Sequence, residues 1–193
     1  MKFRIAILAA GLSVVGPASA ASFCVASADD LTGALLTAEQ NNDASNSIRI
    51  HTGHYVASEG WHVDVHLRGI DITGGFQDEN CQQSPLLDAS LTVLDGNNAV
   101  RPLTINTTFH DGQTGGQILI TGLTFENGSG DRAGGLKISD AGPIYNGAIR
   151  VERNIFRNNT SSDYQQDNSA GGLLAATDGS TTDGATILIV RNN

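Results

Sequence analysis

The residues best suited to chemistry are three polar side chains at alternate positions, His62, Asp64 and His66. Imidazole and carboxylate groups are common zinc ligands. On a strand these side chains would share one face but stand about 7 Å apart, too wide for three ligands on one zinc ion unless the strand bends. His51 or His54 would add a ligand if folding brought it near. The other interpretation, which we favour, is a solvated outer face, and we assign no metal or cofactor.

Short apolar strands must position these side chains, because Val63, Val65 and Leu67 alternate with the polar trio. Turn-forming pairs such as Asp95-Gly96 separate the apolar runs. We expect a turn at 53–55 and further strands at 48–50, 70–76, 91–94, 103–105, 118–120, 149–151 and 186–190.

One stretch of sequence recurs. The apolar positions of residues 118–125 return at 149–156, a shift of 31, and begin to return at 187–189, a further shift of 38. Gly-Gly-Leu at 134–136 returns at 171–173. Repeats of about 20–50 residues indicate a solenoid, in which each unit buries its apolar face on the next. An antiparallel sandwich is the alternative, but direct copies stacked in register favour parallel pairing. The sequence predicts an all-β parallel β-helix.

A single helix is expected ahead of these strands. Asp29 and Asp30 stand where an N-cap belongs, and the apolar residues Leu31, Ala34, Leu35 and Ala38 follow at helical spacing up to residues 40–42. Such a helix would cover the exposed strand edges at one end of a solenoid. We therefore expect a cap over residues 21–45 and β-helix coils over 46–193. Because the pattern predicts an aromatic residue at position 194, we also expect a truncated C-terminus belonging to a longer protein.

Residues 1–20 have the pattern of a signal peptide. Lys2 and Arg4 precede an apolar run at 5–15, and Ala18-Ser19-Ala20 is a small-residue cleavage site. The apolar run is too short to span a bilayer. We expect an exported protein, secreted or on a bacterial cell surface after passage through the periplasm, with no transmembrane segment in the mature chain.

The charge of the chain limits its partners. Removal of Lys2 and Arg4 with the leader takes the formal charge from −9 to −11 and leaves Lys137 as the one lysine. Nucleic acid is excluded as a partner, because phosphate binding needs a basic face. Cell-surface glycans or proteins are compatible partners, and we take the chain to be a monomer.

The two cysteines, Cys24 and Cys81, are expected to form one disulfide in an oxidising compartment. Closing this loop contributes about 3–4 kcal/mol in the chain-entropy model. A reactive thiol or a metal ligand is the alternative, but no Cys-x-x-Cys or Cys/His spacing supports it.

Several stretches together resemble the secreted right-handed parallel β-helix proteins of the pectin-lyase-like superfamily, especially those with polymorphic-outer-membrane-protein-type repeats. They are residues 48–55, 72–81, 92–96, 120–128 and 134–136 and the Phe-x-x-Asn element at 156–159. The resemblance implies a right-handed β-helix. It leaves function open, because such folds serve adhesins, surface scaffolds and polysaccharide-degrading enzymes alike.

An enzyme of that superfamily would carry recognisable groups. The resemblance implies, for a lyase, clustered carboxylates holding calcium and an Arg or Lys that removes a proton from a uronate. Arg150 and Glu152 share a face and Arg153 follows, but one carboxylate is not a calcium site. A hydrolase needs two facing carboxylates, and Asp64 and Asp71 cannot be shown to converge. We assign no catalytic residue.

Aromatic and amide side chains receive structural interpretations. Trp61 and Tyr55 are read as packing rather than as sugar platforms, and Asn127, Asn158 and Asn159 as turn residues or an internal asparagine ladder. The sequence thus favours an exported, non-catalytic scaffold for adhesion or ligand binding. The alternative is a polysaccharide lyase or glycoside hydrolase whose catalytic coils lie beyond Asn193.

Overall fold

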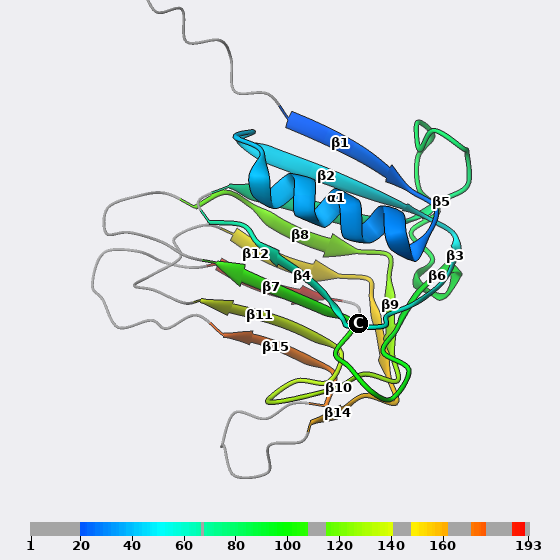
Figure 1. The fold of residues 1–193 in the computed structure, drawn as a ribbon, viewed down its shortest axis with the longest axis vertical. Helices are drawn as coiled ribbons and strands as arrows, with labels where there is room; N and C mark the ends of the chain where they lie inside the picture. The colour runs from blue at the N-terminus through cyan, green and yellow to red at the C-terminus, as the bar shows by residue number, and fades with distance from the viewer. Residues whose placement is uncertain are drawn as a thin grey trace, which may run out of the picture.

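The computed structural model describes residues 20–66, 68–107, 115–140, 148–161, 171–176 and 187–191. These residues form an all-β structure with one α-helix, and every strand pair among them is parallel (Figure 1). The predicted signal peptide lies outside the described residues except for Ala20.

The described strands form three larger sheets and a small one. The first sheet has the order β1 (Ala20–Val25), β2 (Ser45–His51), β5 (Gly69–Phe76), β8 (Ile118–Thr121), β12 (Ala148–Glu152) and β16 (Ile187–Arg191). The second contains β3 (Gly53–Val56), β6 (Thr92–Asp95), β9 (Thr124–Glu126) and β13 (Ile155–Arg157). The third contains β4 (Trp61–Asp64), β7 (Leu103–Thr107), β11 (Leu136–Asp140) and β15 (Leu173–Ala176). β10 (Ser129–Gly130) pairs with β14 (Thr160–Ser161).

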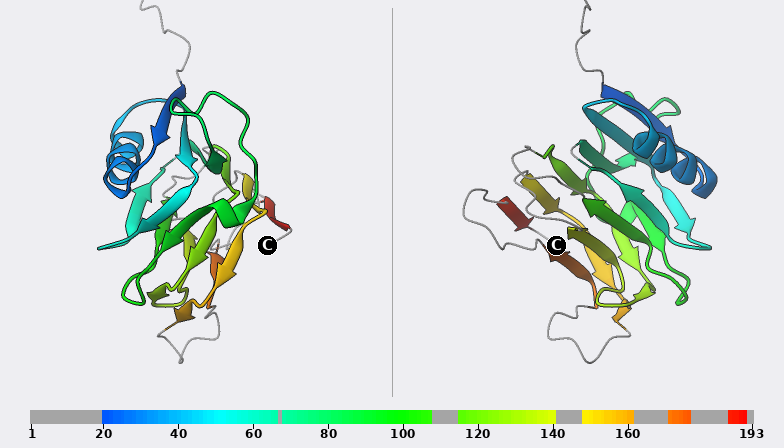
Figure 2. Two further views of the ribbon diagram at one scale, coloured as in Figure 1. Left: turned by 90° about the vertical axis from the view of Figure 1, so that its right-hand side faces the viewer. Right: turned by 60° about the vertical axis from the view of Figure 1, so that its left-hand side comes forward.

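From β2 onward the chain visits the first, second and third sheets in a fixed cyclic order. We call each such passage a circuit: β2, β3 and β4 form one, β5, β6 and β7 the next, and two more lead to β16. Within each of the three sheets, strands from successive circuits pair with one another. Strands of successive circuits therefore follow one another along the long axis, from β1 at one end toward β15 at the other (Figures 1 and 2).

The register confirms the repeat for the copies that begin at residues 118 and 149. Ile118 lies opposite Ile149, and the rings of Phe125 and Phe156 stack with centroids 5.2 Å apart and an interplanar angle of 9°. The Gly-Gly-Leu copies also pair, with Leu136 opposite Leu173.

The expected register of the last copy is wrong by one residue, because Ile149 faces Leu188 rather than Ile187. Residues 187–190 are a continuous apolar run, Ile-Leu-Ile-Val. Shifts of 38 and 39 both place apolar residues opposite β12, so the sequence pattern could not distinguish them.

Alternate residues of the strands form the apolar core. In the first sheet Ile70, Ile118 and Ile149 occupy register positions on successive strands and are all at most 1% exposed. Phe125 in the second sheet and Ile105 in the third are fully buried. Burying one such side chain contributes about 1.5–3 kcal/mol. Burial of these side chains in a shared core therefore helps to stabilise each strand.

The expected helix is present as α1 (Ala28–Gln40), but its N-cap lies earlier than predicted. Ser27 has extended backbone angles, and its hydroxyl accepts a hydrogen bond from Asp30 N at 3.1 Å. Asp29 and Asp30 instead occupy the first turn, where a negative charge interacts favourably with the helix dipole. The buried face of α1 is the predicted set Leu31, Ala34, Leu35 and Ala38.

α1 lies between β1 and β2 in the chain and packs beside β4, the edge strand of the third sheet (Figure 2). Trp61 Nε1 on β4 donates to Thr32 Oγ1 at 3.2 Å, and Arg68 Nη2 donates to Glu39 O at 2.5 Å. The helix thus covers a strand edge that would otherwise be open to pairing.

Two local expectations around the histidines are wrong. Residues 53–55, expected as a turn, belong to β3, because Gly53–Val56 pairs residue by residue with β6. The strand expected to reach residue 67 ends at Asp64, and His66 has a left-handed backbone with φ of 45°. Pairing with β6 overrides the local pattern at residues 53–55, and the left-handed backbone at His66 ends the alternation after β4.

Candidate functional site

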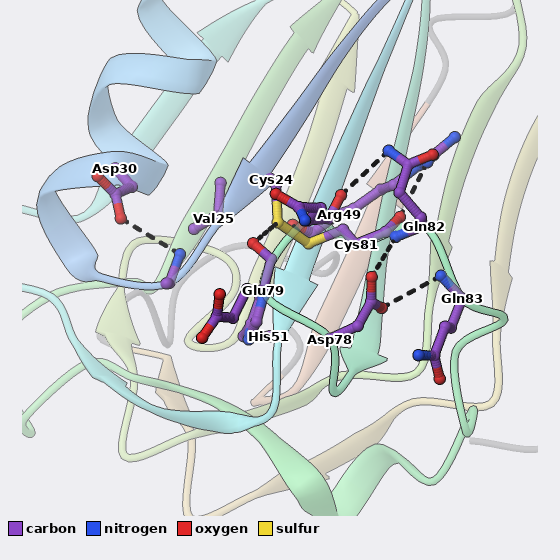
Figure 3. The surroundings of a disulfide bond; sticks show 12 residues. Cys24, Val25, Asp30, Arg49, His51, Asp78, Glu79, Cys81, Gln82 and Gln83 are labelled. Atoms are coloured by element: carbon purple, nitrogen blue, oxygen red, sulfur yellow. Dashed lines mark hydrogen bonds between the residues drawn. A yellow bond between two sulfur atoms is a disulfide. The ribbon is translucent and has the colours of Figure 1, made fainter.

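The expected disulfide joins Cys24 on β1 to Cys81 in the loop after β5 (Figure 3). The Cα atoms are 5.6 Å apart and the two residues are 57 positions apart in sequence. Arg49 Nη1 donates to Cys81 O at 3.0 Å, which anchors the loop to β2. His51 lies close to both sulfur atoms, but these are bonded to each other and are not available as thiolate ligands. This is a structural cross-link.

The loop that carries Cys81 is held by its own hydrogen bonds (Figure 3). Gln82 N and Gln83 N donate to the Asp78 carboxylate at 2.6 and 3.1 Å. The hydrogen bond from Gln82 is the largest influence on Asp78 and lowers its pKa.

The structure does not bring the trio of alternating polar residues together as a set. His62 Nε2 lies 3.0 Å from Asp64 Oδ1, with about half of the His62 side chain exposed. His66 follows the end of β4, where the left-handed backbone breaks the alternation of faces. The histidines at 51 and 54 lie elsewhere, near the disulfide and on β3.

A cluster that sequence reasoning missed lies on the second sheet. His54 on β3 approaches Asp95 on β6 and Glu126 on β9, with Nε2 2.9 Å from Asp95 Oδ2 and 3.6 Å from Glu126 Oε1. Asp95 lies opposite Glu126 in the register. The His54 side chain is 53% exposed, whereas those of Asp95 and Glu126 are 11% and 12% exposed.

Other groups occupy the remaining oxygen atoms of these carboxylates. Asp95 Oδ1 accepts from Asn97 N at 2.7 Å and from Asn127 Nδ2 at 3.1 Å. Arg157 Nε donates to Glu126 Oε2. Burial alone would raise the pKa of Asp95, but its hydrogen bonds with Asn97, Asn127 and His54 outweigh that effect and hold the pKa below its ordinary value of 3.8. Asp95 therefore remains charged near neutral pH.

No local sequence motif indicates this cluster. His54, Asp95 and Glu126 come from three circuits, and only the register of β3, β6 and β9 brings them together. The sequence signal that could have found it was a correct strand assignment at 53–56, followed by alignment of Val56 with Asp95.

The polar residues considered for lyase chemistry form an ion pair. Arg150 Nε and Nη2 both donate to Glu152 Oε1, at 3.0 and 2.8 Å. Arg153 lies beyond the strand with φ of 55°. Arg150 is thus held by its neighbour on the same strand.

Comparison with known proteins finds no match. No family model, curated protein or solved structure is similar to this chain. Among the described helices, none has the length and apolar character needed to span a bilayer.

Two adjoining hollows lie beside β4 and share residues 59–62. The first, of about 480 Å³, is lined by α1 and residues 56–62 and includes the exposed apolar side chains Leu36 and Val56. The second, of about 340 Å³, is lined by polar groups that include Arg101, Thr104 and Asp131. We call them the helix hollow and the polar hollow.

Two aromatic residues, Trp61, which lines both hollows, and Tyr55, are buried. Trp61 and Tyr55 are 6% and 4% exposed. Tyr55 Oη donates to His51 O at 3.1 Å, and burial raises the pKa of Tyr55 to about 12. Little of either side chain is therefore exposed for stacking on a sugar.

Asparagine side chains connect successive circuits. Asn159 Oδ1 accepts from Gly128 N at 2.8 Å, and its Nδ2 donates to Phe125 O at 2.9 Å. Asn127 and Asn158 have left-handed backbones, as turn residues do. Asn154, which the sequence did not single out, makes a similar link and is only 1% exposed. These amides serve the stacking of circuits.

Proposed function

We propose that this chain is an exported right-handed parallel β-helix that acts as a non-catalytic scaffold and binds a ligand on its surface. The observation that carries the proposal is the order of the strands: in each circuit the chain passes through the first, second and third parallel sheets in turn. A right hand is the expected sense, because parallel strands of one sheet are almost always joined by right-handed crossovers.

A scaffold fits the charged groups better than an enzyme does. The candidate cluster contains two carboxylates, Asp95 and Glu126, but a glycosidase needs a general acid whose pKa is raised. The pKa of Asp95 is lowered, and Arg157 holds Glu126. Neither carboxylate lines the helix hollow or the polar hollow.

The proposed ligand is a cell-surface glycan, bound where the two hollows meet. Glu59 is exposed there, and Thr104 lies with Arg101 and Asp131 in the polar hollow. Arg101 Nη2 lies 2.6 Å from Asp131 Oδ1, and this bond lowers the pKa of Asp131. Fixed donors and acceptors next to apolar side chains suit a ligand with hydroxyl groups on a carbon ring.

An array of cell-surface glycans, probed with the labelled protein, tests ligand binding. We expect binding to at least one glycan class, and Glu59→Ala to weaken it about tenfold, the loss of one hydrogen bond to a charged group. Glu79→Ala, which removes an exposed carboxylate near the disulfide, should bind as the unmodified protein does. Absence of binding to every glycan would reject a glycan ligand.

Incubation with polygalacturonate and calcium distinguishes the enzyme alternative. The scaffold proposal predicts no rise in the absorbance of unsaturated products. Formation of such products would contradict the scaffold proposal and would identify the chain as a polysaccharide lyase.

Export is proposed on the basis of the leader sequence. N-terminal sequencing of protein recovered outside the cytoplasm should begin at Ala21, which would shorten β1 by Ala20 alone. Recovery of an uncleaved chain in the cytoplasm would contradict export.

A further inference from the structure

We propose that His54, Asp95 and Glu126 form a binding site for a divalent transition-metal ion of the zinc class. The ligand atoms are His54 Nε2, Asp95 Oδ2 and Glu126 Oε1. The site belongs to the outer face of the second sheet and is separate from both hollows. It goes beyond the proposed glycan binding and does not depend on it.

The spacing of the three atoms fits one ion. Zinc bonds to nitrogen and oxygen ligands are about 2.0–2.2 Å long, so two ligand atoms in a tetrahedral site lie about 3.4 Å apart. The separations from Nε2, 2.9 Å to Oδ2 and 3.6 Å to Oε1, bracket that value. All three atoms lie within 4.8 Å of one another. Small side-chain rotations would complete the site.

The outer partners already orient the carboxylates. Asn97 N and Asn127 Nδ2 bind Asp95 Oδ1, and Arg157 binds Glu126 Oε2. Each carboxylate therefore directs its other oxygen toward His54. Outer hydrogen bonds of this kind fix ligand orientation in protein metal sites.

The composition of the ligand set selects the class of ion. Imidazole with carboxylates suits zinc and neighbouring transition metals, whereas calcium requires six to eight oxygen atoms. Two buried carboxylates beside a single guanidinium leave net negative charge to attract the cation. Because the His54 side chain is half exposed, the fourth position would face solvent and hold water or an oxygen atom of a ligand.

Calorimetric titration of the chelator-treated full chain with zinc chloride tests the site. We expect one ion per chain. His54→Gln and Glu126→Gln should each weaken binding more than about tenfold, the loss seen when even an outer partner of a metal ligand is removed. His66→Asn is the matched control, since asparagine tolerates its left-handed backbone, and it should bind zinc as the unmodified protein does.

A measurement on the unmodified protein makes the result independent of how the variants fold. Zinc should shift the imidazole NMR signals of His54 and leave those of His62 and His66 in place. Unchanged His54 signals at saturating zinc, or equal affinity in all variants, would overturn the proposal.

Discussion

Two regions of the molecule hold their circuits together by different means. At the N-terminal end, the Cys24–Cys81 disulfide ties β1 to the loop after β5, and helix α1 packs against β1, β2 and β4. From β8 to β13, side chains that recur along the chain hold the circuits together. They are the stacked rings of Phe125 and Phe156, and amides that form hydrogen bonds from one circuit to the next.

The difference shows which interactions can be recognised from a repeat in the sequence. A stacked repeat needs the same kind of residue in each circuit, so Phe125 and Phe156 recur at a fixed interval. A cross-link or a cap is made once and has no copy. We therefore expect β8–β13 to be most sensitive to loss of a repeated side chain, and the N-terminal end to loss of its cross-link.

Phe125→Ala should have the largest effect. The ring is fully buried and stacks on Phe156, so its removal leaves a cavity that costs about 3–5 kcal/mol of unfolding free energy. Urea denaturation followed by circular dichroism measures the change. The control Phe23→Ala, at a half-buried position on β1, should cost clearly less. Equal losses would contradict the importance of the stacked ring.

Replacing both cysteines with serine should come next. Opening a loop of 57 residues is expected to cost about 3–4 kcal/mol. Hydrogen exchange should rise in β1 and α1 before it rises in β9 and β13. Uniform exchange along the whole chain would mean that the two regions are not held by separate means.

Asn154→Ala should cost about 1–3 kcal/mol, because it leaves a buried backbone donor unpaired. Leu123 N donates to Asn154 Oδ1 at 3.1 Å, and Asn154 Nδ2 donates to Ile120 O at 3.0 Å. Asn80→Ala, at an exposed position in the Cys81 loop, is the control and should be neutral. A neutral Asn154→Ala would show that this link does not stabilise the stack.

Ser27→Ala should have the smallest effect. It removes the N-cap acceptor of α1 and is expected to cost about 1 kcal/mol. Faster amide exchange at Asp30, compared with the exposed loop variant Ser58→Ala, would reveal it. If Asp30 exchanged at the same rate in both variants, another group would have to cap α1.

The sequence predicted the elements that depend on periodicity. The helix followed from Leu31, Ala34, Leu35 and Ala38, and the pairing of β8 with β12 followed from the interval of 31. β3 was missed because Gly53 looks like a turn residue, and its strand exists through pairing with β6. The register of β16 was missed because its apolar run fits two alignments equally well.

The candidate metal cluster could not be predicted by inspecting residues along one strand. Neighbours two apart on a strand are about 7 Å apart, whereas residues opposite each other on adjacent strands are about 4.8 Å apart. Convergence in stacked parallel strands therefore comes across circuits: Asp95 lies opposite Glu126, and His54, whose register partner is Val93, reaches both carboxylates from two positions along the strand. The spacing of His62, Asp64 and His66 runs along one strand, whereas the cluster forms across adjacent strands.

The pairing of β8 tests the β-helix proposal most directly. Nuclear Overhauser effects measured on the isotope-labelled protein should link Ile118 to both Ile70 and Ile149, and Ile120 to Val151, as parallel circuits require. Contacts between Ile118 and Val151 together with Ile120 and Ile149 would mean antiparallel strands and would contradict the account.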